Sequence, residues 1–379
     1  MGGGLMQLVA YGAQDIYLTG NPQITFFKVV YRRHTNFSME SIEQTINGVV
    51  SGGSSVSVTV SRNGDLVGRM YVEHDPGLGV DENNYGYHIL QEVEVEIGGQ
   101  RIDRHYNHWL NTWAELTEPN STGNATNNSA DMGTGTYTKF QRMACAGGVL
   151  DNDADSGILF IPLQFWFCRN PGLALPLIAL QYHEVKVKIT FSSALETTGN
   201  HTKVFADYIY LDTDERRRFA QVSHEYLIEQ VQHMKSDAES NIELNFNHPV
   251  KELVWTGEWQ NNTGTVGGLN TVLTAANTYL LKLNGHERFS ARDRLYFTRA
   301  QIWQHHTGYG GVTVKDSTAV YSFALKPEEH QPSGTCNFSR IDNAILVQGV
   351  GSAQVLEIYA VNYNVLRIMS GMGGLAYSN

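Results

Sequence analysis

The sequence is poor in cysteine, proline and long apolar runs. Its 379 residues include three cysteines, an odd number with no CxxC spacing, which argues against a disulfide framework and favours a reducing compartment. The nine prolines are few beside 37 glycines, so turns rather than a low-complexity linker are expected. The longest apolar run, LALPLIAL, is far shorter than the roughly 20 residues that cross a bilayer. The N-terminus lacks the basic and apolar segments of a signal peptide, so we expect a soluble protein.

Basic residues are also scarce. Lys and Arg number 27 against 38 Asp and Glu, which gives a net charge of −11. A protein that mainly binds phosphate backbones usually carries an excess of positive charge, so we expect no direct contact with nucleic acid. Two short basic runs, YRRH (31–34) and ERRR (215–218), are better explained by salt bridges at domain or subunit contacts.

Catalytic motifs are missing or incomplete. A nucleophile elbow, GxSxG, is absent, and HEYLI (224–228) lacks the second histidine of a zinc-binding HExxH helix. GMGGLA (371–376) matches GxGxxA in form, but three residues follow it, too few for the helix that would hold a pyrophosphate. We therefore expect no enzyme and no cofactor.

Two places could hold a metal ion. In DNDADSG (151–157) the alternating aspartates are spaced like calcium ligands, but Ser156 and Pro162 stand where an EF-hand has its glycine and its bidentate glutamate. A solvated acidic loop is therefore favoured, with a bound cation as the alternative; the candidate ligands are Asp151, Asp153 and Asp155. His105 and His108 lack a second ligand pair at a useful spacing, so polar packing around Trp109 is favoured over zinc.

Alternation of apolar and polar residues dominates the chain. In EVEVEIGG (92–99) Val93, Val95 and Ile97 share one face and three glutamates share the other, as in a half-buried antiparallel strand. Similar patterns occur at 55–61, 184–191, 241–246, 279–285 and 355–361. Glycine- and asparagine-rich turns separate them, and long amphipathic helices are missing. The pattern predicts an all-β sandwich or barrel.

One charged segment, YLDTDERRRFAQVSHEYLIEQ (210–230), breaks this alternation. Asp212, with Glu215 three residues later, resembles a helix start, so a short helix connecting two domains is predicted. The two sides resemble each other: VEIGGQRIDRHY (95–106) and LKLNGHERFSARD (281–293) share a strand, a glycine turn and a basic residue. A repeat of domain size implies two similar β-sandwiches, and an eight-stranded sandwich with Greek-key connections is a jelly roll.

The segment SFALKPEEHQPSGTCNFSRIDN (322–343) gathers a cysteine, a histidine and several charges, so it could be an active-site loop or an architectural corner. Cys336 has no clear base arrangement, because Pro332 lies between it and His330 and no orienting carboxylate is identifiable. Pro327 and Pro332 cannot donate to a sheet ladder. These features favour a corner that follows a strand.

A polar stretch at 119–136 carries Asn-x-Ser/Thr motifs, which are glycan acceptors in secreted proteins. Without a signal peptide, chance in an Asn- and Thr-rich sequence is the favoured explanation, and an exposed variable loop is expected here. The possible glycan sites are Asn120, Asn124 and Asn127.

Four blocks of the sequence resemble the major capsid proteins of nucleocytoplasmic large DNA viruses, the group that includes phycodnaviruses, iridoviruses and mimivirus relatives. SFALKPEEHQPSGTCNFSRIDN is similar to a signature of that family. Residues 8–40, 169–191 and 362–379 are similar to its N-terminus, the end of its first jelly roll and its C-terminus. The residues that we expect to be structural within these blocks are Asn21, Pro22, Arg32, Arg33, Pro171, Gly172, Pro327, Pro332, Gly334, Asn337, Arg340 and Asp342.

The resemblance implies a double jelly roll: an N-terminal arm at 1–24, a first jelly roll at 25–211, a short, partly helical connector at 212–223 and a second jelly roll at 224–379. It implies a structural protein of the virion that is made and assembled in the host cell cytoplasm. Three chains would form a homotrimeric, pseudo-hexagonal capsomer that tiles an icosahedral shell around an internal membrane. Neighbouring capsomers and minor capsid and vertex proteins are the other expected partners. The chain is short for the family, and we expect the missing length in surface loops.

Within this fold, the Arg340/Asp342 pair and the rigid turns of 327–343 are expected to fix a corner of the second jelly roll. Two other functions remain open on sequence alone. One is a carbohydrate-binding or glycan-processing β-sandwich, because jelly rolls also host lectins and hydrolases. The other is a minor capsid or scaffold protein of the same fold.

Overall fold

The computed structural model describes residues 37–77, 83–120, 137–150, 157–195, 202–261, 267–274 and 276–377. The chain divides into two compact units, Met1–Ser38 and Met39–Asn379, and the larger unit holds the features described below. Strands make up most of its regular structure, as the alternating sequence predicts. None of the helices within the described ranges is long and apolar enough to cross a membrane.

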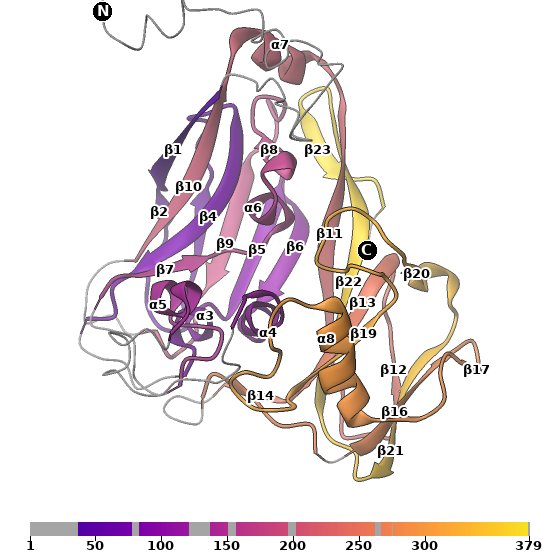
Figure 1. Cartoon of the computed structure of the whole chain (residues 1–379). Helices are drawn as coiled ribbons and strands as arrows, with labels where there is room; N and C mark the ends of the chain where they lie inside the picture. Colours follow the sequence, from indigo (N-terminus) through magenta and orange to yellow (C-terminus); the bar gives the residue numbers. More distant parts are fainter. Residues whose placement is uncertain are drawn as a thin grey trace, which may run out of the picture. The chain divides into compact units, whose positions relative to one another are not determined.

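The first lobe contains strands β1 to β10 in two five-stranded sheets (Figure 1). One sheet has the order β1-β10-β4-β7, with β8 beside β4, and the other has the order β2-β3-β9-β5-β6. The strands are β1 Phe37–Gln44, β2 Ile46–Asn47, β3 Ser55–Thr59, β4 Leu66–His74, β5 Glu92–Ile97, β6 Gln100–Tyr106, β7 Leu159–Pro162, β8 Leu175–Pro176, β9 Val185–Thr190 and β10 Thr202–Leu211.

The second lobe contains strands β11 to β23. A six-stranded sheet has the order β11-β22-β13-β19, with β20 beside β13 and β23 beside β22, and a five-stranded sheet has the order β12-β21-β16-β17, with β18 beside β16. The strands are β11 His224–Lys235, β12 Asn241–Glu243, β13 Pro249–Gly257, β14 Trp259–Gln260, β15 Leu269–Asn270, β16 Ala276–Leu283, β17 His286–Glu287, β18 Arg292–Asp293, β19 Thr318–Ser322, β20 Cys336–Asn337, β21 Ala344–Gly351, β22 Leu356–Met369 and β23 Met372–Leu375.

Strand order is the same in the two lobes. The first strand of each lobe lies beside a long strand from its end, β1 beside β10 and β11 beside β22. The opposing sheets correspond too, with β3-β9-β5-β6 in the first lobe and β12-β21-β16-β17 in the second. This order, in which early and late strands pair within antiparallel sheets, is that of a jelly roll. The predicted all-β double jelly roll is therefore confirmed.

A hairpin occupies the same place in both lobes and explains the resemblance between their sequences. Strands β5 and β6 are joined through Gly98 and Gly99, and strands β16 and β17 through Asn284 and Gly285. All four residues have positive φ, between 51° and 81°. Two consecutive left-handed residues form the tight turn that suits the twist of a hairpin, and Asn-Gly is its strongest sequence signal.

Helices occur mainly in the connections between strands. The helical segments are α3 Tyr85–His88, α4 Asn107–Thr117, α5 Lys139–Ala144, α6 Trp166–Arg169, η2 Pro171–Leu173, α7 Thr213–Gln221, the π-helical turn η3 Tyr296–Ala300, α8 Gln301–His305 and η4 Phe338–Arg340. The short helix predicted after Asp212 is α7, and the Asp212 carboxylate accepts a hydrogen bond from the Thr213 N–H. Helix α4 was not predicted, although Trp109, Trp113 and Leu116 follow the i, i+4, i+7 spacing of one helix face.

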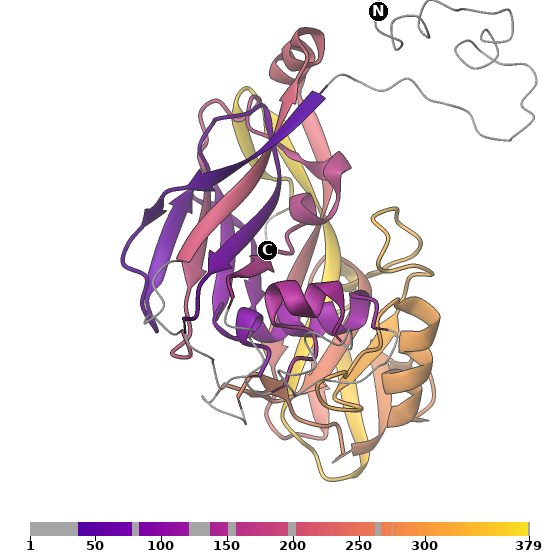
Figure 2. The same ribbon diagram turned by 60° about the vertical axis from the view of Figure 1, so that its left-hand side comes forward.

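The two lobes share buried surface. The core of the first lobe includes Ile228, Leu366 and Ile368, which belong to β11 and β22 of the second lobe. A separate cluster packs Trp109 and Trp113 of α4 against the sheet that contains β13, β19 and β22. In both views α4 lies beside this sheet (Figures 1 and 2). Helix α4 therefore marks the junction of the two lobes.

Candidate functional site

The segment 322–343 forms a corner of the second lobe, as predicted. It leaves β19 at Ser322, returns as β20 and ends in the short helix η4. Strand β20 pairs with the start of β13, where Val250 lies opposite Cys336. The segment therefore joins the edge of the six-stranded sheet to the strand β21 of the opposing sheet.

Apolar packing and backbone hydrogen bonds hold this corner. Phe338 is buried and packs edge-on against Phe246 and Phe323. The Asn337 side chain accepts a hydrogen bond from the Ser339 N–H, and that of Asn284, in the hairpin turn, accepts from the N–H groups of residues 342 and 343. These contacts tie the corner to the turn of the neighbouring hairpin.

Gly334 allows a close approach of two backbones in the same corner. Its φ is +139°, and an added Cβ would lie 2.6 Å from the carbonyl oxygen of Phe323. Only glycine adopts this conformation without strain. The glycine expected to be structural is therefore required by both its dihedral angle and its surroundings.

The expected role of the Arg340/Asp342 pair needs correction. Both side chains are exposed, and the salt bridges among the described residues do not include a pair between them. The corner is held through the backbone of residue 342 instead of its carboxylate. Pro327 is buried and Pro332 is exposed.

An active-site role for this segment finds no support in its geometry. Burial raises the pKa of the Cys336 thiol, which leaves it less nucleophilic. His330 Nδ1 lies 3.7 Å from Glu229 Oε1, so its carboxylate neighbour is on β11. The sequence-based preference for an architectural corner agrees with this arrangement.

The remaining predicted residues are scattered or undescribed. Pro171 and Gly172 form η2, where the Asn170 side chain accepts a hydrogen bond from the Gly172 N–H. Asn120 is half-buried and lies three residues after the end of α4. Outside the described residues lie Asn21, Pro22, Arg32, Arg33, Asn124, Asn127, Asp151, Asp153 and Asp155.

A buried histidine between two carboxylates lies where α8 meets the six-stranded sheet. His306 Nε2 is 3.0 Å from Glu252 Oε2, and both side chains are fully buried. Its other nitrogen, Nδ1, is 2.9 Å from Glu328 Oε1. Burial alone would lower the pKa of His306, but the two carboxylates outweigh it and raise the pKa to about 9. His306 is therefore charged at neutral pH and links α8, β13 and the corner segment.

A second buried ion cluster crosses the junction. Arg169 Nη2 of α6, in the first lobe, lies 2.7 Å from Glu229 Oε2 on β11. Lys251 Nζ of β13, fully buried, lies 2.8 Å from Glu229 Oε1. Against the opposing effect of burial, these cations and His330 lower the pKa of Glu229 to about 2. Breaking such a buried pair by removing one partner is strongly destabilising.

A cleft of about 900 Å³ opens beside this cluster. Arg169, Glu229, Glu328 and His330 line its polar side. Glu328 and His330 belong to the segment 322–343, whereas Arg169 and Glu229 were not predicted, because they are 60 residues apart and no local motif connects them. Residues of both lobes line the cleft, and Cys336 is not among them.

Comparison with known proteins identifies the family of the chain. Residues 25–221 match the family model described as major capsid protein N-terminus, and residues 215–374 match the model of the large eukaryotic DNA virus major capsid protein. The chain belongs to this family of viral major capsid proteins. The two matches meet at α7, and the resemblance seen in the sequence is confirmed.

Curated relatives agree over full lengths. The major capsid protein of Pyramimonas orientalis virus is 54% identical over 413 residues, and that of Paramecium bursaria Chlorella virus 1 is 43% identical over 456 residues. Each comparison covers 100% of both chains. Because these alignments exceed the 379 residues of this capsid protein, its relatives carry insertions.

Solved structures of viral capsid proteins are similar to the fold of this chain. The quasi-atomic model of the PBCV-1 virus capsid has a TM-score of 0.77 and 39% identity, and covers 94% of this chain and 100% of that chain. The Faustovirus major capsid protein has a TM-score of 0.65 at 11% identity, over 95% and 94% of the two chains, which shows the shared fold. This capsid protein therefore has a structural role in the virion and is not an enzyme.

Proposed function

We propose that this capsid protein assembles as a homotrimer, and that each trimer is a capsomer with a pseudo-hexagonal outline. The observation that carries the proposal is the repeated strand order of the two lobes. Three chains with two similar lobes each would place six similar lobes around a threefold axis. Such a unit can occupy a hexagonal position in an icosahedral shell. Closed cyclic assembly of this kind is common among homo-oligomers.

A closed ring needs two different contact surfaces on each chain. In the second lobe, Trp303 of α8 is 82% exposed and Leu325 is 76% exposed. His305 Nδ1 hydrogen-bonds to the Leu325 carbonyl oxygen, so the two apolar side chains belong to neighbouring segments. In the first lobe, Tyr182 is 76% exposed. Exposed aromatic residues are enriched in protein interfaces, and we assign the Trp303 and Leu325 surface to a subunit contact.

The other proposed features follow from the family. The arm at 1–24 would order against a neighbour or an inner layer, and the jelly rolls would extend over 25–211 and 224–379 on either side of the connector at 212–223. Neighbouring capsomers and minor capsid and vertex proteins would be the partners, with an internal membrane nearby. The net charge of −11 fits a protein without direct contact to the genome. Assembly would take place in the host cell cytoplasm.

Electron microscopy of the purified chain tests the proposal. We expect particles with threefold symmetry and six lobes, whereas single two-lobed particles would contradict the trimer. Trp303→Ala should reduce the trimer fraction in sedimentation velocity, because it removes the most exposed aromatic side chain of the assigned surface. Val49→Ala is the matched control, since Val49 is 79% exposed and lies in the first lobe. Equal trimer fractions in both variants would reject the assigned surface but not the trimer.

A further inference from the structure

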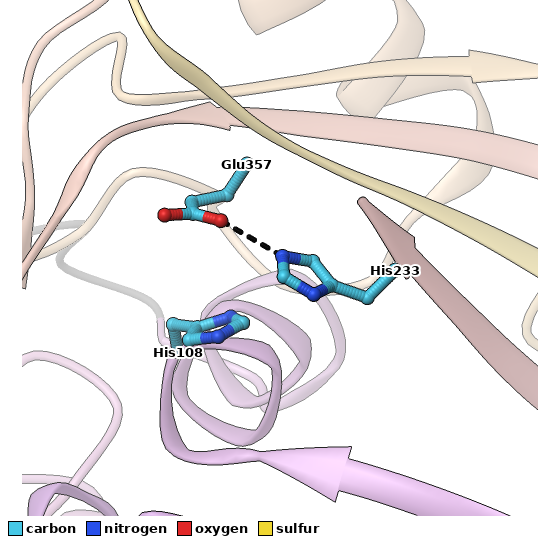
Figure 3. Close-up of side chains that lie close together, drawn as sticks. All are labelled: His108, His233 and Glu357. Atoms are coloured by element: carbon cyan, nitrogen blue, oxygen red, sulfur yellow. Dashed lines mark hydrogen bonds and ion pairs between the residues drawn. The ribbon is translucent and has the colours of Figure 1, made fainter. Parts of the chain in front are cut away.

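Three potential metal ligands converge at the junction of the lobes. His108 comes from the first turn of α4, His233 from β11 and Glu357 from the start of β22. One ligand atom from each lies within 4.8 Å of the other two, and no other group of this kind occurs among the described residues. Figure 3 shows the two imidazoles and the carboxylate reaching toward one another from the helix and the two strands.

We propose that His108, His233 and Glu357 bind one divalent transition-metal ion, of which zinc is the best match, and that this ion fastens α4 of the first lobe to the six-stranded sheet of the second. Two imidazoles and one carboxylate form a known zinc ligand set, in which a fourth position is left for water. Nitrogen ligands disfavour calcium and magnesium, which take oxygen.

The geometry needs only a small adjustment. Zinc binds histidine nitrogen and carboxylate oxygen at about 2.0–2.2 Å, so two ligand atoms of a tetrahedral site are about 3.4 Å apart. His233 Nε2 and Glu357 Oε2 are now 2.8 Å apart, as a hydrogen-bonded pair. Entry of an ion would open this pair by about half an ångström and would draw in the third ligand by about 1.4 Å. Side-chain rotation can supply shifts of this size.

The two histidine ligands make the proposed binding dependent on pH. A histidine binds a metal as neutral imidazole. Metal affinity should therefore fall as the pH is lowered.

The surroundings orient the ligands and leave them a path to solvent. His108 Nδ1 hydrogen-bonds to the Tyr359 hydroxyl, and its ring stacks on Tyr106. Partners of this kind fix the rings of metal-binding histidines. A hollow of about 270 Å³ is lined by Tyr106 and His233, which gives an ion access from the surface.

One cation already lies near the carboxylate. Lys235 Nζ is 3.5 Å from Glu357 Oε1, but it is closer, at 2.8 Å, to Glu258 Oε1. Lys235 can therefore remain paired with Glu258 while Glu357 turns to a metal. The hollow beside His233 is also lined by Arg101, Asp103 and Arg104, so the preference for a metal rests on the ligand set and not on net charge. The inference concerns a single chain and does not depend on the proposed trimer.

Zinc titration of the full chain tests the proposal. After removal of metals with a chelator, isothermal titration calorimetry with zinc chloride should show one tight site per chain, and zinc should raise the melting temperature. Glu357→Gln keeps the shape of the side chain but removes the anionic ligand, and we expect it to weaken zinc binding by more than about tenfold. His233→Gln should have the same effect. Cobalt bound to the wild-type chain should show the intense visible absorption of a four-coordinate site, which reports on the site without any variant.

Controls separate this site from other histidines, of which the chain has fourteen in all. Glu225→Gln and His224→Gln change residues of the same strand, β11, outside the cluster. Both controls should keep the affinity and the thermal shift of the wild type. Zinc binding that is equally strong in Glu357→Gln and Glu225→Gln, or a wild-type chain without saturable binding, would overturn the proposal.

Discussion

Two histidines at the junction of the lobes have opposite charge states. His306 lies between Glu252 and Glu328, and these carboxylates raise its pKa to about 9. His108 is half-buried, and its pKa is lowered well below the usual range by desolvation and by the neighbouring His233 and Lys235. Burial alone favours the neutral form of both. The placement of two carboxylates therefore decides which histidine is a cation and which is a neutral hydrogen-bonding group.

The comparison has structural consequences. The charged His306 is part of a buried salt bridge that links α8, β13 and the corner segment. The neutral His108 keeps a nitrogen lone pair, as a metal ligand must. The salt bridge of His306 should stabilise the folded chain with or without a metal ion. The neutral His108 should stabilise it only modestly unless an ion is bound.

His306→Leu should have the largest effect. It removes the cation and leaves Glu252 charged and buried without its partner, so we expect a loss of about 3–5 kcal/mol in the free energy of unfolding. Urea unfolding followed by fluorescence measures it. His286→Leu, at an exposed position of β17, is the control and should stay close to wild type. A small effect of His306→Leu would mean that Glu252 is neutral.

The pH dependence of stability should separate the two histidines. The pKa of His306 is raised on folding, so its contribution is complete below the unfolded value of about 6.5 and is lost as the pH rises through about 9, by about 3 kcal/mol in total. For His108 the pKa is lowered, so stability is lost as the pH falls below about 6.5. Unfolding measured from about pH 5 to 9 tests both slopes.

Single variants show which histidine causes each slope of stability against pH. His306→Gln should flatten the alkaline slope and leave the acidic one, and His108→Gln should do the reverse. If His306→Gln kept the full alkaline slope, another group would cause that slope, which would contradict the raised pKa of His306.

His108→Leu should have a smaller effect than His306→Leu. It removes a neutral ring and leaves the Tyr359 hydroxyl without that partner, which costs about 1–2 kcal/mol. Measured without metal by urea unfolding, a loss as large as that of His306→Leu would show that His108 is charged.

Arg340→Ala should have the smallest effect on the folded chain. The side chain is exposed, so the free energy of unfolding should change by less than about 0.5 kcal/mol. Its effect is expected on assembly, as a lower yield of trimer in size-exclusion chromatography. A strongly destabilised variant would instead restore the role in the corner that the sequence suggested.

Much of the fold could be predicted from local sequence. The alternation in β5 and β9 and the Asn-Gly turn at 284–285 each follow from the geometry of neighbouring residues. Helix α4 was not predicted, because His105 and His108 were interpreted only as polar residues around a packed Trp109, although the spacing of Trp109 and Trp113 is helical. Local patterns do not indicate the function of the two lobes, and the prediction of a viral capsid protein came from the family resemblance.

The junction could not be predicted from sequence. His108, His233 and Glu357 are more than a hundred residues apart, and Arg169 and Glu229 are 60 residues apart. Their meeting depends on how α4 packs on the sheet of the other lobe, which involves long-range contacts without a local signature. His105, which is near His108 in sequence, pairs with Asp103 and stacks on Phe165 instead of joining this group.

The native mass of the purified protein tests most directly whether three copies of this two-lobed chain form the functional unit. Native mass spectrometry should give a particle of three times 42.2 kDa that persists when a calcium chelator is added. A chain that remains a monomer at all concentrations, with its lobes folded, would contradict the account.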